Sequence, residues 1–199
     1  MINKIIVTGK FQNNIKKDHS AGGHCFYIGQ LEAKRKSGAV DTIPVIISGA
    51  LLQKSGAQTR KTGAFKEICG QLRTYNDHKH VRVYVLAQDI QETKEVINIC
   101  NLSGTICKTP TLRTTPRGVD ICDFILAINR AHGKSAYIPC IAWNREAQRV
   151  AACGTGTHLE MCGRIQSRQH NKGTCVEVSV FEIKKITLPN TKKGALNND

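Results

Sequence analysis

Hydrophobic and polar residues alternate in short segments along most of this chain, and long apolar runs are absent. β-Branched residues and a period of two are typical of half-buried strands. This pattern predicts strands at residues 2–10, 25–33, 41–48, 65–75 and 80–88, and again at 96–106, 119–129, 135–143, 157–167 and 173–184. The pattern therefore indicates an all-β protein.

Helical periodicity is confined to a short segment after the third strand of each set. Residues 144–152 predict one helix, because Asn144 can cap its N-terminus and three apolar residues share one face. These residues are Ala147, Val150 and Ala151. The corresponding stretch 50–62 contains Gly56, so a helix there is less strongly indicated.

The chain repeats its own pattern once. Three matches occur in the same order, at offsets of 95, 95 and 93 residues: Asn3–Gly9 with Asn98–Gly104, Ile43–Ser48 with Ile138–Trp143, and Gly63–Arg73 with Gly156–Gln166. An ordered set at a nearly constant offset indicates duplication. We expect two domains, at residues 1–95 and 96–187, and a short flexible tail at 188–199. Five strands with a helix between the third and fourth follow the order of the OB fold, a five-stranded Greek-key barrel.

The charge of the chain favours an anionic partner. Lys and Arg number 29 against 15 Asp and Glu, which gives a formal net charge of +14. Both halves carry the excess equally, since each has a net charge of +7. Such a field attracts polyanions, of which nucleic acid is the commonest, although solubility alone would also account for it.

The nine cysteines do not form a recognisable metal or disulfide framework. Their number is odd, no Cys-x-x-Cys pair occurs, and most lie in apolar or alternating runs where a thiol behaves as a small hydrophobe. We therefore expect free thiols, no metal and no cofactor. The start of the chain is too short and too alternating for a signal peptide, and no apolar run reaches the roughly 20 residues of a membrane helix. This favours a cytoplasmic, nucleoid-associated protein without a membrane partner.

Several stretches of the second copy resemble a known family, in order along the chain. They are Leu102–Ile106, Leu112–Gly118, Asp123–Arg130, Tyr137–Trp143 and Gly163–Arg168. Over roughly residues 96–185 the chain resembles the bacterial single-stranded DNA-binding proteins. The first copy is similar to that family at 1–11 and 70–74, but its segment 12–23 does not fit.

The resemblance implies a non-enzymatic protein that binds single-stranded DNA on rings and cations. In the family, aromatic rings on the third strand and just past the fourth stack on bases, and these positions fall on Tyr137, Trp143 and His170. Tyr137 and Trp143 are six residues apart and share one face of a strand, whereas Ile138, Cys140 and Ala142 should point inward. Core packing is the alternative role for both rings.

Basic residues of the second copy cluster where an OB groove would bind phosphates. We expect contacts from Arg113, Arg117, Arg130, Lys134, Arg164, Arg168 and Lys172. The first copy has Thr42 and Ser48 in place of Tyr137 and Trp143, so we expect weaker binding there or a role in dimerisation. Its candidate contacts are Lys34, Arg35, Lys36, Arg73 and Tyr75.

Other classes of function fit less well. Cys153 and His158 lie too close along the chain to form a triad by proximity alone, and no phosphate-binding Gly-x-x-x-x-Gly-Lys loop is present. A primosome-type protein-interaction module and an RNA-binding OB protein remain as alternatives.

The resemblance also implies an assembly. Family members usually combine four OB domains, so a two-domain chain should form a homodimer. Housekeeping members end in an acidic tip that recruits replication proteins, whereas residues 192–199 contain one acidic side chain. We therefore expect the protein to coat DNA in replication, recombination or the maintenance of a mobile element, without recruiting those enzymes.

Overall fold

The computed structural model describes residues 1–12, 15–56, 65–77, 80–170 and 173–189, which form one continuous sheet of twelve strands. The N-terminal half contains β1 (Asn3–Phe11), β2 (Lys16–Ala21), β3 (His24–Lys34), β4 (Val40–Ser48), α1 (Gly49–Ser55), β5 (Lys66–Asp77) and β6 (His80–Glu92). The C-terminal half contains β7 (Asn98–Ile106), β8 (Thr111–Thr114), β9 (Asp120–Asn129), the 3-10 turn η1 (Ala131–Gly133), β10 (Ser135–Trp143), α2 (Asn144–Ala151), β11 (His158–His170) and β12 (Gly173–Thr187).

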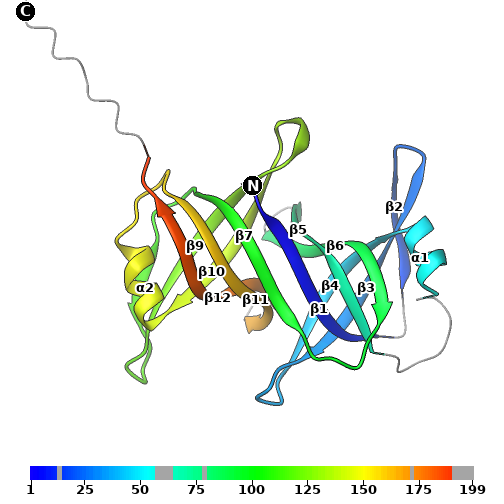
Figure 1. Cartoon of the computed structure of the whole chain (residues 1–199), viewed down its shortest axis with the longest axis horizontal. Helices are drawn as coiled ribbons and strands as arrows, with labels where there is room; N and C mark the ends of the chain where they lie inside the picture. The colour runs from blue at the N-terminus through cyan, green and yellow to red at the C-terminus, as the bar shows by residue number, and fades with distance from the viewer. Residues whose placement is uncertain (13–14, 57–64, 78–79, 171–172, 190–199) are drawn as a thin grey trace, which may run out of the picture.

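Each half of the sheet closes into a barrel. In the N-terminal half β1 pairs with both β5 and β3, and β4 closes the barrel by pairing with β6 in parallel. In the C-terminal half β7 pairs with β11 and β9, and β10 pairs with β12 in parallel. Figure 1 shows the two barrels side by side, with β1 and β7 adjacent at the centre. The predicted all-β class and the two OB folds are confirmed.

Two glycines allow the first strand of each barrel to bend between its two partners. A β-carbon on Gly9 would lie 2.3 Å from the carbonyl oxygen of Glu32, and one on Gly104 would lie 2.6 Å from that of Ala127. Neither position has room for a side chain. The two glycines are 95 residues apart, at the offset of the sequence repeat.

The pairing of β1 with β7 joins the barrels and has local two-fold symmetry. Ile5 lies opposite Cys100, its own counterpart in the repeat, at the centre of an antiparallel ladder. The same arrangement is found where two identical subunits meet across an isologous interface. The flanking pairs are Asn3 with Leu102 and Val7 with Asn98.

Two asparagines extend the barrels where their backbone ladders end. The Asn3 side chain donates to the carbonyl of Leu72 and accepts from its N–H, both at 2.9 Å. Asn98 does the same with Ile165, at 2.8 and 3.0 Å. A side-chain amide thus replaces a pair of backbone hydrogen bonds at equivalent places in both halves.

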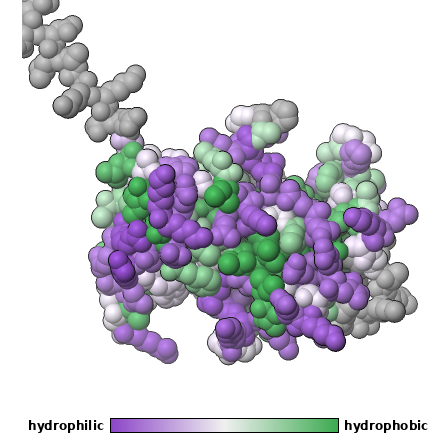
Figure 2. All heavy atoms as spheres, in the orientation of Figure 1, coloured by the Kyte–Doolittle hydropathy of each residue, from purple (hydrophilic) through white to green (hydrophobic). Residues whose placement is uncertain are grey.

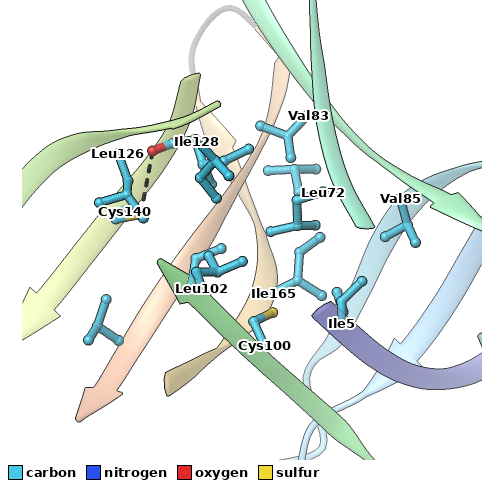
Figure 3. Packing of buried hydrophobic residues seen from close by; sticks show 14 of the residues in the cluster. Ile5, Leu72, Val83, Val85, Cys100, Leu102, Leu126, Ile128, Cys140 and Ile165 are labelled. Atoms are coloured by element: carbon cyan, nitrogen blue, oxygen red, sulfur yellow. Dashed lines mark hydrogen bonds between the residues drawn. The ribbon is translucent and has the colours of Figure 1, made fainter. Parts of the chain in front are cut away.

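The hydrophobic core is continuous across the two halves. Figure 3 shows Ile5 and Leu72 of the N-terminal half beside Cys100 and Ile165 of the C-terminal half, and all four belong to one buried cluster. Cys140 is buried in the same cluster, and its thiol donates to the carbonyl of Ile138. The halves therefore stabilise each other through apolar burial as well as through the β1–β7 ladder.

A buried carboxylate connects the barrels on one side. Asp41 is fully buried and accepts two hydrogen bonds from Arg35, at 2.6 and 2.7 Å. It also accepts from the backbone N–H and the hydroxyl of Ser167 on β11, at 2.6 and 3.2 Å. The guanidinium of Arg35 is held by Asp41 and also donates to the Ser167 carbonyl, so the predicted contact of Arg35 with DNA would require it to leave these partners.

The structure differs from the sequence prediction in three further elements. Strands β2 and β8 were not predicted, because every residue in them is exposed and no alternation marks them. The helix α1 does form, since Ser48 accepts from the N–H of Leu51 and Gly56 ends the helix in a left-handed conformation.

The predicted cap of the second helix is wrong. Trp143 occupies the cap position of α2 without a side-chain hydrogen bond, and Asn144 is the first helical residue, with φ of 49°. The predicted apolar face is confirmed for Ala147 and Val150, which are buried. Neither helix in the described part of the chain is long and apolar enough to cross a membrane.

Replacing Asp41 should weaken the connection between the barrels. Asp41→Asn removes the charge that holds Arg35 and one of the two oxygens that accept hydrogen bonds from Arg35 and Ser167, so we expect a loss of about 3 kcal/mol in the free energy of unfolding. Asp123→Asn is the matched control, because its pair with Arg113 is partly exposed on both sides and should contribute less than about 1 kcal/mol. Urea unfolding of both variants measures the difference, and equal losses would contradict the assigned role of Asp41.

Candidate nucleic-acid interface

Strand β10 presents two aromatic rings on its outward face. Tyr137 is 48% exposed and Trp143 is 37% exposed. Ile138, Cys140 and Ala142, which alternate with them, are buried. The predicted division of this strand into an inner and an outer face is confirmed, and neither ring belongs to the core.

Trp143 lies in a row of side chains that crosses the outer face of the C-terminal barrel. Its indole N–H donates to the hydroxyl of Ser179 on β12 at 3.0 Å, and Ser179 is the cross-strand partner of Arg164 on β11. On the other side of Trp143, Ile121 of β9 is the cross-strand partner of both Trp143 and Arg113. The row therefore brings together one ring and two cations from three strands, β10, β8 and β11.

A second ring beside Arg164 was missed by the sequence analysis. The Arg164 guanidinium carbon lies 5.7 Å from the centroid of the Phe181 ring, which is 53% exposed. Val176, Val178 and Val180 are buried, so the alternation of β12 turns Phe181 outward. That alternation is the signal in the sequence that could have identified it.

The Arg164 guanidinium is partly shielded from water. Burial lowers its pKa, and the charge of Arg35 lowers it further, whereas Asp41 acts in the opposite direction. Its Nε atom is buried and has no hydrogen-bond partner among the described residues. Arginine keeps its charge in proteins, so this group can offer a partly desolvated donor to an anion.

Arg168 lies on the same side of β11 but has an acidic partner. Its guanidinium lies 3.2 Å from Glu177, a buried carboxylate that also accepts from Gln166 at 2.9 Å. Arg164, Gln166 and Arg168 face successive outward positions of β12, as the period of two predicts. The charge of Arg168 is nevertheless balanced by Glu177, whereas Arg164 has no ion pair among the described residues.

The remaining basic candidates lie on β8, at strand ends and in the loops around the two barrels. Arg113 is half exposed and pairs with Asp123 at 2.7 Å, an ion pair that an exposed phosphate can replace. Arg130 is half-buried at the end of β9 and donates its backbone N–H to Lys134. Exposed residues are Arg117, Lys134, Lys34 and Lys36. Lys172 and the side chain of His170 lie outside the described part of the structure.

The two candidates on β5 lie beside a tyrosine of β6. Tyr84 is the cross-strand partner of Arg73, and its ring centroid is 5.9 Å from that of Tyr75. Tyr75 is 48% exposed. They adjoin the contact between the barrels, in which the neighbouring Thr74 accepts from the backbone N–H of Tyr137 at 3.2 Å.

Cys153 and His158, weighed above as a nucleophile and its base, each have other hydrogen-bond partners in the fold. Cys153 is buried and donates to the Arg149 carbonyl, and His158 is engaged by the hydroxyls of Ser103 and Thr105. Burial raises the pKa of Cys153, which opposes its use as a nucleophile. All nine cysteines lie in the described residues as free thiols, and no group of three metal-ligating side chains is found there.

Comparisons with known proteins agree on one family. A model described as the single-strand binding protein family matches residues 97–187. A single-stranded DNA-binding protein of Halalkalibacterium halodurans is 32% identical over 95 residues, which are 44% of this chain and 56% of the relative. Single-stranded DNA-binding protein B of Bacillus subtilis is 30% identical over 95 residues, which are 44% of this chain and 84% of the relative. The chain spans little more than half the length of several other curated relatives.

One solved structure resembles the whole chain. The wild-type single-stranded DNA binding protein from Thermus aquaticus matches with a TM-score of 0.77 at 19% identity, covering 99% of this chain and 98% of that one. At this identity the likeness shows the fold, and it extends over both barrels.

The environment of the thiols predicts their reactivity. Burial raises the pKa of Cys122 to about 11, so only about one molecule in a thousand carries its thiolate at pH 8. We expect iodoacetamide at pH 8 to label the exposed Cys107 well before Cys122, and urea to make all nine cysteines reactive. Peptide mass spectrometry over time measures the order, and labelling of Cys122 at the rate of Cys107 in the folded protein would contradict it.

Proposed function

This chain belongs to the single-strand binding protein family, and from that premise we propose that it binds single-stranded DNA without sequence preference and without catalysing a reaction. The relatives are named as single-stranded DNA-binding proteins. The excess of cations in both halves of this sequence is consistent with the same activity. Protection of unpaired DNA in replication, recombination or mobile-element maintenance would follow from such binding.

The row from Arg113 through Trp143 to Arg164 is the observation that best supports this proposal. A flexible single strand offers bases that stack on flat rings and phosphates that pair with cations. Trp143 and Phe181 supply exposed rings, and Arg164 lies against one of them. Because every base has a π-face, such a row binds without reading sequence.

We assign the DNA contacts by exposure and by partner. Bases would stack on Tyr137, Trp143 and Phe181, and phosphates would bind Arg113, Arg117, Arg130, Lys134 and Arg164. Arg168 would contribute only after leaving Glu177. His170 and Lys172 stay in the proposal through the family resemblance alone, and Lys34 and Lys36 would make weaker contacts on the N-terminal barrel.

We also propose that two chains assemble into a homodimer with four OB domains, each chain contributing the units at residues 1–95 and 96–187. The outward side of the β1–β7 ladder supports this arrangement. Two outward pairs flank the centre of the ladder, Ile6 with Ile99 and the polar Lys4 with Asn101, and the half-buried Cys69 lies opposite Ile6 on β5. Figure 2 shows hydrophobic side chains gathered over the region where β1 and β7 lie in Figure 1.

DNA binding is tested with fluorescein-labelled oligothymidine, by anisotropy at several salt concentrations. We expect Trp143→Ala to weaken binding by about tenfold or more, because stacking of one base contributes about 1–3 kcal/mol. Arg164→Gln should reduce the slope of log K against log salt by about 0.7, the value for one phosphate on a single strand.

Lys54→Gln serves as the control, because it removes one cation from the exposed surface of α1 without touching the proposed row. A matched oligouridine competitor separates DNA binding from RNA binding. If the unmodified protein failed to bind oligothymidine at low salt, the proposed function would be wrong.

The assembly is tested by light scattering on the eluting protein. We expect twice the mass of the chain for the unmodified protein and the mass of one chain for Ile6→Glu, because a buried charge at the centre of an apolar contact is unfavourable. Leu112→Glu is the control, since it places the same charge on an exposed apolar side chain of β8. A monomeric unmodified protein would contradict the proposed dimer.

A further inference from the structure

In addition to the β1–β7 ladder and the shared core, the two barrels contact each other at two places, here called the first and second seams, which are related by the sequence repeat. At the first seam, β5 meets β10, and Tyr137 donates its N–H to the hydroxyl of Thr74 at 3.2 Å. At the second seam, β11 meets β4, and Thr42 donates its N–H to the hydroxyl of Ser167 at 3.0 Å. These two hydrogen bonds are equivalents, so the seams can be compared position by position.

The second seam balances its own charges. Arg35 is paired with the buried Asp41, and Arg168 is paired with the buried Glu177. Gln166 donates to Glu177 at 2.9 Å and completes the network. These two ion pairs therefore offer no net positive charge to an anionic ligand, although Arg164 lies near enough to this seam for the charge of Arg35 to add to the effect of burial in lowering its pKa.

The first seam carries different side chains at the equivalent positions. Ala136 stands at the position of Asp41, and Tyr84 stands at the position of Glu177, so both carboxylates are missing. Arg73 replaces the neutral Gln166, while Arg130 occupies the position of Arg35. Two guanidinium groups therefore face this seam, and neither has an ion-pair partner among the described residues.

The two arginines lie close enough to affect each other and are partly desolvated. Burial lowers the pKa of Arg73, and the charge of Arg130 lowers it further. Burial raises the pKa of Tyr84, and the charges of Arg130 and Arg73 each oppose this rise more strongly than the charge of Asp18 adds to it. The Nε atoms of Arg73 and Arg130 are buried without a hydrogen-bond partner among the described residues. Like charges held together with unused donors are unfavourable unless an anion binds between them.

Exposed aromatic rings from both barrels lie beside the first seam. Tyr75 and Tyr137 are each 48% exposed. Tyr75 follows Thr74, which accepts from the backbone N–H of Tyr137, so the two tyrosines belong to opposite barrels and adjoin the same hydrogen bond. The second seam has Arg168 and Thr42 at these positions and offers no aromatic surface there.

We propose that the first seam is a composite anion site in which one DNA phosphate bridges Arg73 and Arg130, with neighbouring bases on Tyr75 and Tyr137, and that the bound strand crosses between the barrels at this seam and not at the second. This inference rests on the proposed function and extends it to the N-terminal barrel. It also gives the strand a defined path over a molecule whose folds are nearly two-fold symmetric.

The test uses the full chain with Arg73→Gln, Arg130→Gln and the double variant. Arg73→Gln places in the first seam the residue that the second seam already has. With an oligothymidine of about 30 nucleotides, long enough to cover both OB domains, we expect each single variant to bind about tenfold more weakly. The double variant should lose less than the product of the two single effects, because both arginines hold the same phosphate.

The salt dependence and a conservative variant separate charge from folding. Arg73→Gln should lower the log–log salt slope by about 0.7, whereas Arg73→Lys should restore most of that slope. Lys54→Gln removes the same charge outside the seam and should leave the affinity for the long oligonucleotide close to that of the unmodified protein. Thermal unfolding should show that Arg73→Gln is as stable as the unmodified protein or more so, since it removes one of two repelling charges.

The outcomes distinguish this site from the proposed function. If the long oligonucleotide binds all three seam variants as tightly as the unmodified protein while Arg164→Gln weakens binding, the composite site is wrong and the proposed function stands. If the two single losses of affinity multiplied fully in the double variant, Arg73 and Arg130 would act independently. That result would also overturn the shared phosphate. If the unmodified protein binds no single-stranded DNA, the proposed function itself fails.

Discussion

The antiparallel pairing of β1 with β7 is the constraint on which the rest of the structure depends. It aligns Ile5 with its own repeat counterpart Cys100 and thereby sets the two barrels about a local two-fold axis. This placement produces the shared core beneath the ladder. It also brings β11 against β4 and β5 against β10. A shift of the ladder by one residue would turn the buried side chains of β1 outward, so its register is strongly determined.

The near symmetry of the backbone contrasts with the asymmetry of the side chains. Equivalent asparagines, glycines and hydroxyls hold equivalent places in both halves, because the barrel geometry requires them. The surfaces differ, since Asp41 and Glu177 balance charge at one seam, whereas alanine and tyrosine occupy the corresponding positions at the other. The two halves therefore share one backbone architecture and differ in the charges that their side chains carry at the two seams.

Much of the fold and part of the candidate site could be predicted from the sequence. Alternation and the ordered repeat identified ten strands and the exposed face of Tyr137 and Trp143, because burial on one side of a strand leaves a period of two. Strands β2 and β8 left no such trace, since they are exposed on both sides. The role of Arg35 could not be inferred either, because its partner Ser167 is 132 residues away and only the tertiary structure brings them together. Phe181 was visible in the alternation of β12 but was overlooked.

Joining the two barrels in one polypeptide has a consequence for how the protein can evolve. In a dimer of identical subunits every substitution appears on both sides of the symmetry axis, so a repulsive pair of arginines would be imposed twice. Here Asp41 has become part of a stabilising connection on one side while Ala136 leaves the other side open. Fusion thus lets one flank hold the molecule together and leaves the opposite flank free to specialise.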